Sequence, residues 1–414
     1  MASTNGARRV VVTGMGVVTP IGQNVNDFWA GLRSGRNGVS ALGGFPLEDL
    51  KILIAAQIHD FDPRARLRGS KRDKLITQAD RYSWFAAAAA EEATRMSGLE
   101  FPIADPYRSA CIIGSGAGGL VTFENSYRAL FLEKKRATHP LTLLRIIGSS
   151  ASAHVGIEYG IKGPTFATCS ACSTATHALG IARDYIKHGV VDVAIAGASE
   201  SVINYGTMKA WQALHVLSPE GCFPFAKKRN GTVLAEGAGI LLLEEYEHAK
   251  ARGAKILAEL VGYGMTSDSK DMVNPDIEGP REAMRLALED ARLAPSSIDY
   301  LNAHGTATTL NDLNETNAIK DVFGKHAYNL AISSTKSAHG HPLGAGGGIE
   351  AVACIKAIED GWVPPTLGLD EAGDGCDLDY IPNVGRNKPV QYTMSNSFAF
   401  GGLNAVVIFG APPA

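Results

Sequence analysis

Three side chains in separate segments of the sequence could carry out covalent chemistry together. Cys172 lies in FATCSACSTATHALG, between a short apolar run and an amphipathic helical pattern. His304 lies in NAHGTAT, and His341 lies in STKSAHGHPLGAGGG. One thiol and two histidines on separate turns suggest an enzyme that holds an acyl group on sulfur while a second reaction takes place beside it.

The surroundings of Cys172 favour an active thiol. Ser173 and Thr174 are good helix-start residues and Gly189 is a good helix stop, so this cysteine should precede a helix. The positive end of a helix dipole favours the thiolate. The alternative is a small buried hydrophobic residue, which is the commonest fate of a free cysteine, and we expect it for Cys169.

Both histidines are expected on exposed turns, His304 at a strand end and His341 just before a helix, where an imidazole can donate to a developing oxyanion or move a proton. A lone loop histidine is usually only solvated, and we interpret three others in that way: His139, His248 and His326. Lys336 and Glu350 bracket the His341 segment. They could form an ion pair that sets the protonation of this histidine, or they could be unrelated surface charges.

The chain closes with MSNSFAFGGLNAVVIFG, in which two phenylalanines precede Gly401 and Gly402. A bulky residue on a glycine hinge could form a gate over a pocket, with the glycines absorbing the motion. The alternative is a pair of core phenylalanines before a turn.

These residues need elements that bring them together, and the sequence contains one α/β unit twice. The expected elements are a strand at 8–20, a helix at 81–99 and a strand with a glycine-rich loop at 109–120, then a strand at 256–268, a helix at 279–295 and a strand running into a loop at 298–309. We therefore expect a duplicated domain of mixed sheets covered by helices, one compact unit with halves 1–250 and 251–414.

Composition excludes several classes of function. The chain has 414 residues, 45% of them hydrophobic, and a net charge of −3, which does not suit nucleic-acid binding. Cys169 and Cys172 form a C-x-x-C, but no second pair completes a metal cage, so we expect no metal.

The loop GSGAGG at 114–119 is not a G-x-G-x-x-G followed by a long helix and an acidic residue, so we interpret it as a tight turn and not as a dinucleotide site. No signal peptide and no apolar stretch of about 20 residues are found, so we expect a cytoplasmic protein with reduced thiols and no membrane association.

With these motifs in order, the chain resembles the β-ketoacyl-acyl-carrier-protein synthases, the condensing enzymes of the thiolase fold. The motifs are SACSTATHALG, NAHGTAT, SSTKSAHGHPLGA and NSFAFGG, and the likeness runs nearly end to end. It is closest to the synthase II type, including the nodulation protein E branch and the polyketide ketosynthases. The resemblance implies an α/β, thiolase-like fold with duplicated βαβαβαββ halves and a five-layered αβαβα architecture.

The resemblance also assigns roles by position. Cys172 matches the acyl-accepting nucleophile, and His304 and His341 match the histidines that bind the malonyl thioester and promote decarboxylation. Lys336 matches a lysine that supports the histidines, and Glu350 matches a buried acid in the same network. Phe400 matches the gating phenylalanine, and its N–H with that of Cys172 would form the oxyanion hole. The residues expected to contact substrate are Thr306, Thr308, Ala117, Trp211, Gly401 and Gly402, whereas Asp312 and Glu315 are expected to be structural.

The implied reaction is a decarboxylative condensation that lengthens an acyl chain by two carbons and leaves a 3-keto group. It requires no cofactor beyond the phosphopantetheine that arrives on the carrier protein. Some positions depart from the family pattern: Ala399 and Leu403 at the gate, Asn230 at a turn, and the small Ala117 beside the expected acyl pocket. Trp211 falls near the same pocket and could offset the space that Ala117 leaves. These departures leave the acyl specificity open.

Carrier proteins are acidic, so a basic docking surface is expected. Its candidates fall in two runs: Arg64, Arg66, Arg68, Lys71, Arg72 and Lys74, and then Lys134, Lys135 and Arg136. The resemblance implies a homodimer. The alternatives are a polyketide or polyene ketosynthase subunit that acts in a heterodimer with a second chain, and a non-catalytic chain-length partner. Such partners typically lack the cysteine that this chain has at 172, and a biosynthetic thiolase would need a second catalytic cysteine near residue 400.

Overall fold

The strands of both halves join in one ten-stranded sheet, ordered β5-β4-β6-β7-β1-β8-β14-β13-β9-β10. The computed structural model describes residues 8–68 and 71–413. The strands of this sheet are β1 (Val10–Val18), β4 (Ser109–Gly114), β5 (Thr165–Phe166), β6 (Val193–Glu200), β7 (Gly237–Glu245), β8 (Ala258–Ser267), β9 (Tyr300–Asn302), β10 (Ala331–Ser333), β13 (Tyr392–Ala399) and β14 (Leu403–Gly410). Two short ribbons pair β2 (Ser40–Ala41) with β3 (Ile54–Ala55) and β11 (Trp362–Val363) with β12 (Arg386–Asn387).

The two halves of this sheet repeat one topology. In the first half β1 and β7, then β7 and β6, are antiparallel, whereas β6 and β4, then β4 and β5, are parallel. In the second half the same sequence of pairings runs through β8, β14, β13, β9 and β10. The repeated order agrees with the expected duplication. A boundary near residue 250 stays a prediction, which the repetition supports.

The halves meet edge to edge through a short antiparallel contact between β1 and β8. Val11 pairs with Glu259 and Val12 with Ala258, and the Leu257 N–H donates to the Val12 carbonyl at 2.8 Å. The sequence patterns predict the strands but not this junction. It satisfies backbone groups that would otherwise line two open sheet edges.

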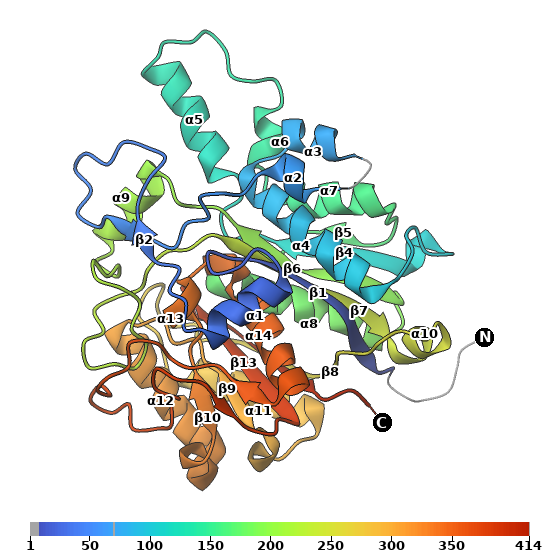
Figure 1. Cartoon of the computed structure of the whole chain (residues 1–414), viewed down its shortest axis with the longest axis vertical. Coiled ribbons are helices and arrows are strands. Elements are labelled where there is room, and N and C mark those ends of the chain that lie inside the picture. Colours follow the sequence, from blue (N-terminus) through green and yellow to red (C-terminus); the bar gives the residue numbers. More distant parts are fainter. Residues whose placement is uncertain (1–7, 69–70, 414) are drawn as a thin grey trace.

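Helices cover the outer face of each half of the sheet, and further helices lie between the two halves (Figure 1). They are α1 (Val25–Arg33), α2 (Pro63–Arg66), α3 (Arg72–Gln78), α4 (Arg81–Ser97), α5 (Leu120–Phe131), α6 (Thr142–Ile146), α7 (Ser150–Tyr159), α8 (Thr174–Lys187), α9 (Tyr205–Ala213), α10 (Tyr246–Ala251), α11 (Glu278–Ala291), α12 (Thr309–Phe323), α13 (Lys336–His339) and α14 (Gly346–Asp360). Helices α8 and α14 pack against each other and against strands of both halves. Helices α4 and α7 cover the outer face of the first half, and α11 and α12 cover the outer face of the second. The five layers are therefore α4 with α7, the first half of the sheet, α8 with α14, the second half, and α11 with α12.

Glycines allow the closest of these contacts. A Cβ at Gly14 or Gly16 of β1 would overlap the carbonyl oxygens of Ala93 and Ala89 in α4. A Cβ at Gly348 of α14 would likewise collide with Gly239 of β7. The glycine content therefore serves helix-on-sheet packing as well as turns.

Helix α5 stands away from the rest of the fold in Figure 1 and has no fully buried residue. Phe123, Tyr127 and Phe131 form a row along it, with successive ring centroids 4.4 and 5.7 Å apart. Within the described ranges 8–68 and 71–413, no helix has the length and apolar character that crossing a membrane requires.

Candidate active site

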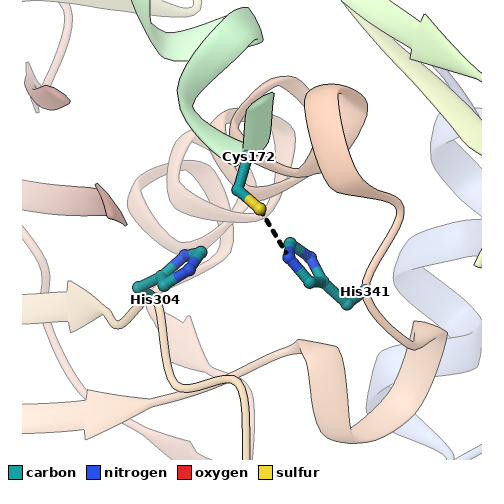
Figure 2. Close-up of side chains that lie close together, drawn as sticks. All are labelled: Cys172, His304 and His341. Carbon is teal, nitrogen blue, oxygen red and sulfur yellow. Dashed lines mark hydrogen bonds between the residues drawn. The ribbon is translucent and has the colours of Figure 1, made fainter. Parts of the chain in front are cut away.

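The three candidate catalytic side chains meet at the ends of different elements, as Figure 2 shows. Cys172 lies in a 3-10 turn, Ala171–Ser173, that leads directly into α8. His304 follows β9 by two residues, and His341 follows α13. The turn before α8 is tight, with Ala171 at a φ of 46°. Strand ends and helix starts thus place the groups as the sequence patterns predict.

His341 contacts the thiol directly. Its Nε2 lies 3.0 Å from Cys172 Sγ, and the rings of His304 and His341 are 5.5 Å apart at 84°. All three side chains are buried, which corrects the expectation of exposed histidines. The turns that hold them lie inside the molecule, because other loops and the β13–β14 hairpin cover them.

Burial sets the resting protonation of this site. It raises the pKa of Cys172 to about 12, although the nearby Lys336 ammonium acts in the opposite direction. Burial, followed by the charge of Lys336, holds the pKa of both His304 and His341 well below the usual range. The site at rest is therefore a neutral thiol beside two neutral imidazoles. The thiolate expected from the helix dipole is not the resting form, because desolvation of a charged sulfur outweighs the dipole.

Lys336 and Glu350 form a buried ion pair behind the histidines, with both side chains 1% exposed. This observation rejects the alternative of unrelated surface charges. Burial raises the pKa of Glu350, and Lys336 opposes that shift. The role of this pair in supporting the histidines stays a prediction.

Glu315 holds the loop that carries His304. Its carboxylate accepts the backbone N–H groups of His304 and Gly305 at 2.8 Å each, and the Asn396 amide at 3.0 Å. Burial raises the pKa of Glu315 to about 7. Asp312 accepts the N–H of Phe225 at 2.7 Å. Both acids bind backbone groups, in line with the structural role expected for them.

A cavity of about 290 Å³ leads to the three groups. Its lining contains Trp211, Asn230, Thr306, Thr308, Phe400, Gly401 and Gly402. Ala117 does not line this cavity. It packs instead in an apolar cluster that also contains Cys172 and Trp211. Contact of these residues with a substrate stays a prediction.

The two phenylalanines of the closing segment have different environments. Phe398 is buried on β13, and its ring centroid lies 6.0 Å from that of His304. Phe400 lines the cavity, and its ring stacks on Trp211 at 5.7 Å and 29°. Phe398 also lines the cavity, so both phenylalanines border it, and the role of Phe400 as a gate stays a prediction. Both Phe400 and Cys172 line the cavity, and an oxyanion hole formed by their N–H groups stays a prediction.

Cys172, His304 and His341 also offer three ligand atoms within 4.8 Å of one another, a set that a soft divalent cation could use. Histidines that bind metals usually donate their other N–H to an acceptor. No protein group pairs with Nδ1 of His304 or of His341 in the part of the chain that the structure describes. The ammonium of Lys336 also disfavours a cation here. These surroundings suit acyl transfer better than metal binding.

The basic residues predicted to dock a carrier protein lie away from the cavity lining. Several are engaged locally: Arg66 donates to the Gln23 carbonyl, Lys71 donates to the Ile157 carbonyl, and Lys135 pairs with Glu133 at 2.8 Å. Arg64, Arg68 and Lys74 are exposed on or beside α2 and α3. Their role in docking stays a prediction.

Two parts of the structure differ from what the sequence predicts: one segment of the cavity wall was not expected, and Cys169 is exposed where burial was expected. Asp268 and residues 271–276 line the cavity, although their sequence indicates only a polar connection between a strand and a helix. Glu200, an acid within the small-residue run AIAGASES, is buried and accepts the N–H groups of Gly116 and Gly344 at 2.8 and 3.1 Å. Cys169 was expected to be buried and is exposed, because strand β5 ends at Phe166 and leaves this cysteine on a loop.

A buried thiol paired with a histidine, next to a second histidine at the end of a cavity, is suited to holding an acyl group on sulfur. Comparison with known proteins agrees with this chemistry. Residues 7–249 match the family description "Beta-ketoacyl synthase, N-terminal domain", and residues 257–370 match "Beta-ketoacyl synthase, C-terminal domain". The chain belongs to the β-ketoacyl synthase family, a family of condensing enzymes.

Similarity to individual proteins extends over the whole chain. Nodulation protein E of Rhizobium meliloti (strain 1021) is 43% identical over 407 residues, 97% of this chain and 99% of that protein. The 3-oxoacyl-[acyl-carrier-protein] synthase 2 of Coxiella burnetii (strain RSA 493 / Nine Mile phase I) is 42% identical over 409 residues, 97% of this chain and 98% of that protein. Among solved structures, the ishigamide ketosynthase/chain length factor has a TM-score of 0.94 at 33% identity, covering 99% of this chain and 100% of that one. This similarity confirms the expected thiolase-like α/β fold.

Proposed function

We propose that this chain is a 3-oxoacyl-[acyl-carrier-protein] synthase in which Cys172 carries the growing acyl chain. The observation that carries the proposal is the 3.0 Å contact between Cys172 Sγ and His341 Nε2, with His304 beside it at the end of a cavity. The family and the two relatives named above support the reaction class.

The first half-reaction transfers the acyl group to sulfur. His341 Nε2 takes the thiol proton as Cys172 Sγ attacks the thioester carbonyl, which avoids a free buried thiolate. The N–H groups of Cys172 and Phe400 bind the resulting oxyanion. The C–S bond to phosphopantetheine then breaks, and the departing thiol takes the proton.

The second half-reaction forms the carbon–carbon bond. A malonyl thioester enters beside Thr306 and Thr308, and neutral His304 and His341 hydrogen-bond its carbonyl oxygen as carbon dioxide leaves. The resulting enolate attacks the acyl carbonyl on Cys172. The C–S bond breaks and releases the Cys172 thiolate, a proton from water restores the thiol, and the 3-ketoacyl product stays on the carrier. The scheme uses no nucleotide, metal or redox group.

Peptide-mapped mass spectrometry tests the proposal. The protein is incubated with acyl-carrier-protein thioesters of increasing chain length, and malonyl-carrier protein is then added. We expect an acyl adduct on Cys172 that malonyl-carrier protein discharges, and no adduct in Cys172→Ala. Cys169→Ser is the matched control and should still load. An adduct on Cys169 instead, or an adduct on Cys172 that malonyl-carrier protein leaves in place, would contradict the proposal.

A second candidate is a ketosynthase subunit that loads Cys172 only in a heterodimer. The similarity to the ishigamide ketosynthase/chain length factor favours it. The intact Cys172–His341 contact argues against a non-catalytic chain-length partner. Loading of the chain by itself would favour the homodimer over this candidate.

We also propose a cytoplasmic location, because catalysis by a free thiol requires reducing conditions and the six cysteines are free.

A further inference from the structure

One buried carboxylate joins the segments that carry Cys172 and His341. Glu200 is the last residue of β6, its side chain is completely buried, and it lies outside the cavity lining. Its Oε2 accepts the Gly116 N–H at 2.8 Å and the Gly344 N–H at 3.1 Å. Two backbone segments that are far apart in the sequence therefore meet at a single carboxylate oxygen.

Gly116 connects this carboxylate to the turn before α8. The Cys169 thiol donates to the Gly116 carbonyl at 3.6 Å. A Cβ at Gly116 would lie 3.0 Å from Glu200 Oε2 and 3.6 Å from the Ala171 carbonyl oxygen. The glycine loop thus lies between the carboxylate and the residue that precedes the nucleophile.

Gly344 connects the same carboxylate to the segment of His341. It lies three residues after this histidine, in the 3-10 turn Leu343–Ala345. A Cβ at Gly344 would lie 2.7 Å from Glu200 Oε2 and 3.2 Å from the Cβ of Thr174 at the start of α8. The turn, the carboxylate and the start of α8 therefore pack without room for another side chain.

Both turns have backbone conformations that need support from their surroundings. Ala171, next to Cys172, has a φ of 46°, and Leu343, next to Gly344, has a φ of 41°. The left-handed region is unfavourable for residues with a side chain, and such conformations persist where surrounding contacts impose them. Glu200 hydrogen-bonds one of these turns directly and supports the other through the glycine loop.

We propose that Glu200 is a positioning residue that holds Cys172 Sγ and His341 Nε2 at the 3.0 Å distance at which the thiol proton is transferred. The inference rests on the proposed function, because it assigns Glu200 to the loading step of that reaction. A misplacement of about 1 Å can slow a reaction about 100-fold. Since Glu200 lies outside the cavity lining, its substitution should change the maximal loading rate and not the substrate concentration that gives half of it.

Two substitutions separate the reach of this side chain from its charge. Glu200→Gln keeps the reach and can accept the same two N–H groups through its amide oxygen. Glu200→Asp keeps the charge but is one carbon shorter. Burial raises the pKa of Glu200 to about 7, although hydrogen bonds from Ser115 and Gly116 oppose that shift. A neutral amide therefore resembles a form that the native side chain adopts near pH 7.

Single-turnover loading of Cys172 from an acyl-carrier-protein thioester measures the effect. We expect maximal loading about 100-fold slower in Glu200→Asp and within about threefold of the unaltered protein in Glu200→Gln. Crystal structures of the two variants should show Cys172 Sγ and His341 Nε2 beyond hydrogen-bonding distance in Glu200→Asp and close to 3.0 Å apart in Glu200→Gln. If the unaltered protein loads no thioester, the proposed function fails, and these two structures still decide the inference.

Glu92→Asp is the matched control. The Glu92 carboxylate of α4 also accepts two backbone N–H groups, from Val17 at 3.1 Å and Val25 at 2.9 Å, and burial likewise raises its pKa. This variant should lower the thermal unfolding midpoint and leave the loading rate unchanged. Equal slowing in Glu92→Asp and Glu200→Asp would overturn the proposal, because that pattern reflects a general loss of stability.

Two further results would also overturn the proposal. One is normal loading in Glu200→Asp, and the other is equal slowing in Glu200→Asp and Glu200→Gln, which would mean that hydrogen bonding to the two N–H groups does not set the rate. Gly344→Ala repeats the test if Glu200→Asp does not fold, because its Cβ would displace Glu200 Oε2. Loading should be slow in this variant, and normal loading would count equally against the proposal.

Discussion

At the scale of single residues, the chemistry of the site depends on how burial divides protons between sulfur and nitrogen. Cys172 at rest is a thiol because removing a thiolate from water costs more than Lys336 and the helix dipole supply. His304 and His341 are neutral for the same reason. A neutral imidazole can accept the thiol proton when an acyl group arrives and can still hydrogen-bond a carbonyl afterwards.

The two histidines should therefore affect different steps. Only His341 contacts the sulfur, so His341→Ala should slow acyl loading of Cys172 by about 100-fold, which is typical of losing a general base. His304→Ala should slow loading far less and should suppress decarboxylation of malonyl-carrier protein. Stopped-flow loading and carbon dioxide release measure the two steps separately. Equal slowing of loading in both variants would refute this division.

The raised pKa of Cys172 predicts how its alkylation depends on pH. Below a thiol pKa of about 12, the thiolate fraction rises tenfold for each pH unit, so iodoacetamide should react about ten times faster per unit between pH 7 and 9. The measurement uses Cys169→Ser, which removes an exposed competing thiol. A rate that stays constant across this range would instead reveal a resting thiolate–imidazolium pair.

At the scale of elements, the β13–β14 hairpin forms one wall of the cavity, and its movement as a gate stays a prediction. Ala399 and Leu403 pair at its end, and Phe400, Gly401 and Gly402 form the loop between them. Gly401 and Gly402 have φ angles of 81° and 67°, in the left-handed region that favours glycine. Trp211 from α9 stacks on the Phe400 ring, so these two aromatic side chains form one part of the cavity wall.

The two loop glycines should differ in their tolerance of a methyl group. A Cβ at Gly402 would lie 2.5 Å from the Cβ of Asp268, whereas one at Gly401 would be no nearer than 3.8 Å to its neighbours. Both substitutions strain the backbone by about 1 kcal/mol, and the overlap at Gly402 adds to that cost. Gly402→Ala should lower the thermal unfolding midpoint and the loading rate more than Gly401→Ala does. The reverse order would show that the loop moves freely of Asp268.

At the scale of the whole molecule, the exposed apolar face of α5 is the feature that the monomer leaves unexplained. Phe123, Tyr127 and Phe131 form a row on α5, the helix α6 that contacts α5 carries Leu143 and Leu144, and all five side chains are exposed. A surface of this kind is typical of an interface between protein chains. It supports the dimer proposed above, whether the partner is a second copy or a related chain.

Disrupting this face should therefore change the mass of the particle in solution. We expect the unaltered chain to form a dimer by light scattering, and Phe131→Ser with Leu143→Ser to shift it toward the monomer. Val190→Ser, an exposed apolar position outside α5 and α6, is the control. A monomer in both the unaltered and the substituted protein would refute the homodimer and direct attention to a second chain.

The sequence by itself determined the duplicated α/β order, the strands and helices that present Cys172, His304 and His341, and the glycine turn at Gly401 and Gly402. These depend on local periodicity, turn residues and motif spacing, which neighbouring residues specify. It predicted neither helix α5 nor α12, because α5 has no fully buried face and α12 follows an irregular loop.

Only the tertiary structure decided the protonation of the site and the Lys336–Glu350 pair, and it showed that both Phe398 and Phe400 line the cavity. It also joined Asp268 and residues 271–276 to the start of α12 along the cavity wall, and it left Cys169 exposed. Each of these depends on burial by segments distant in the sequence. Burial sets the cost of a charge and the exposure of a side chain, and no local pattern contains that information.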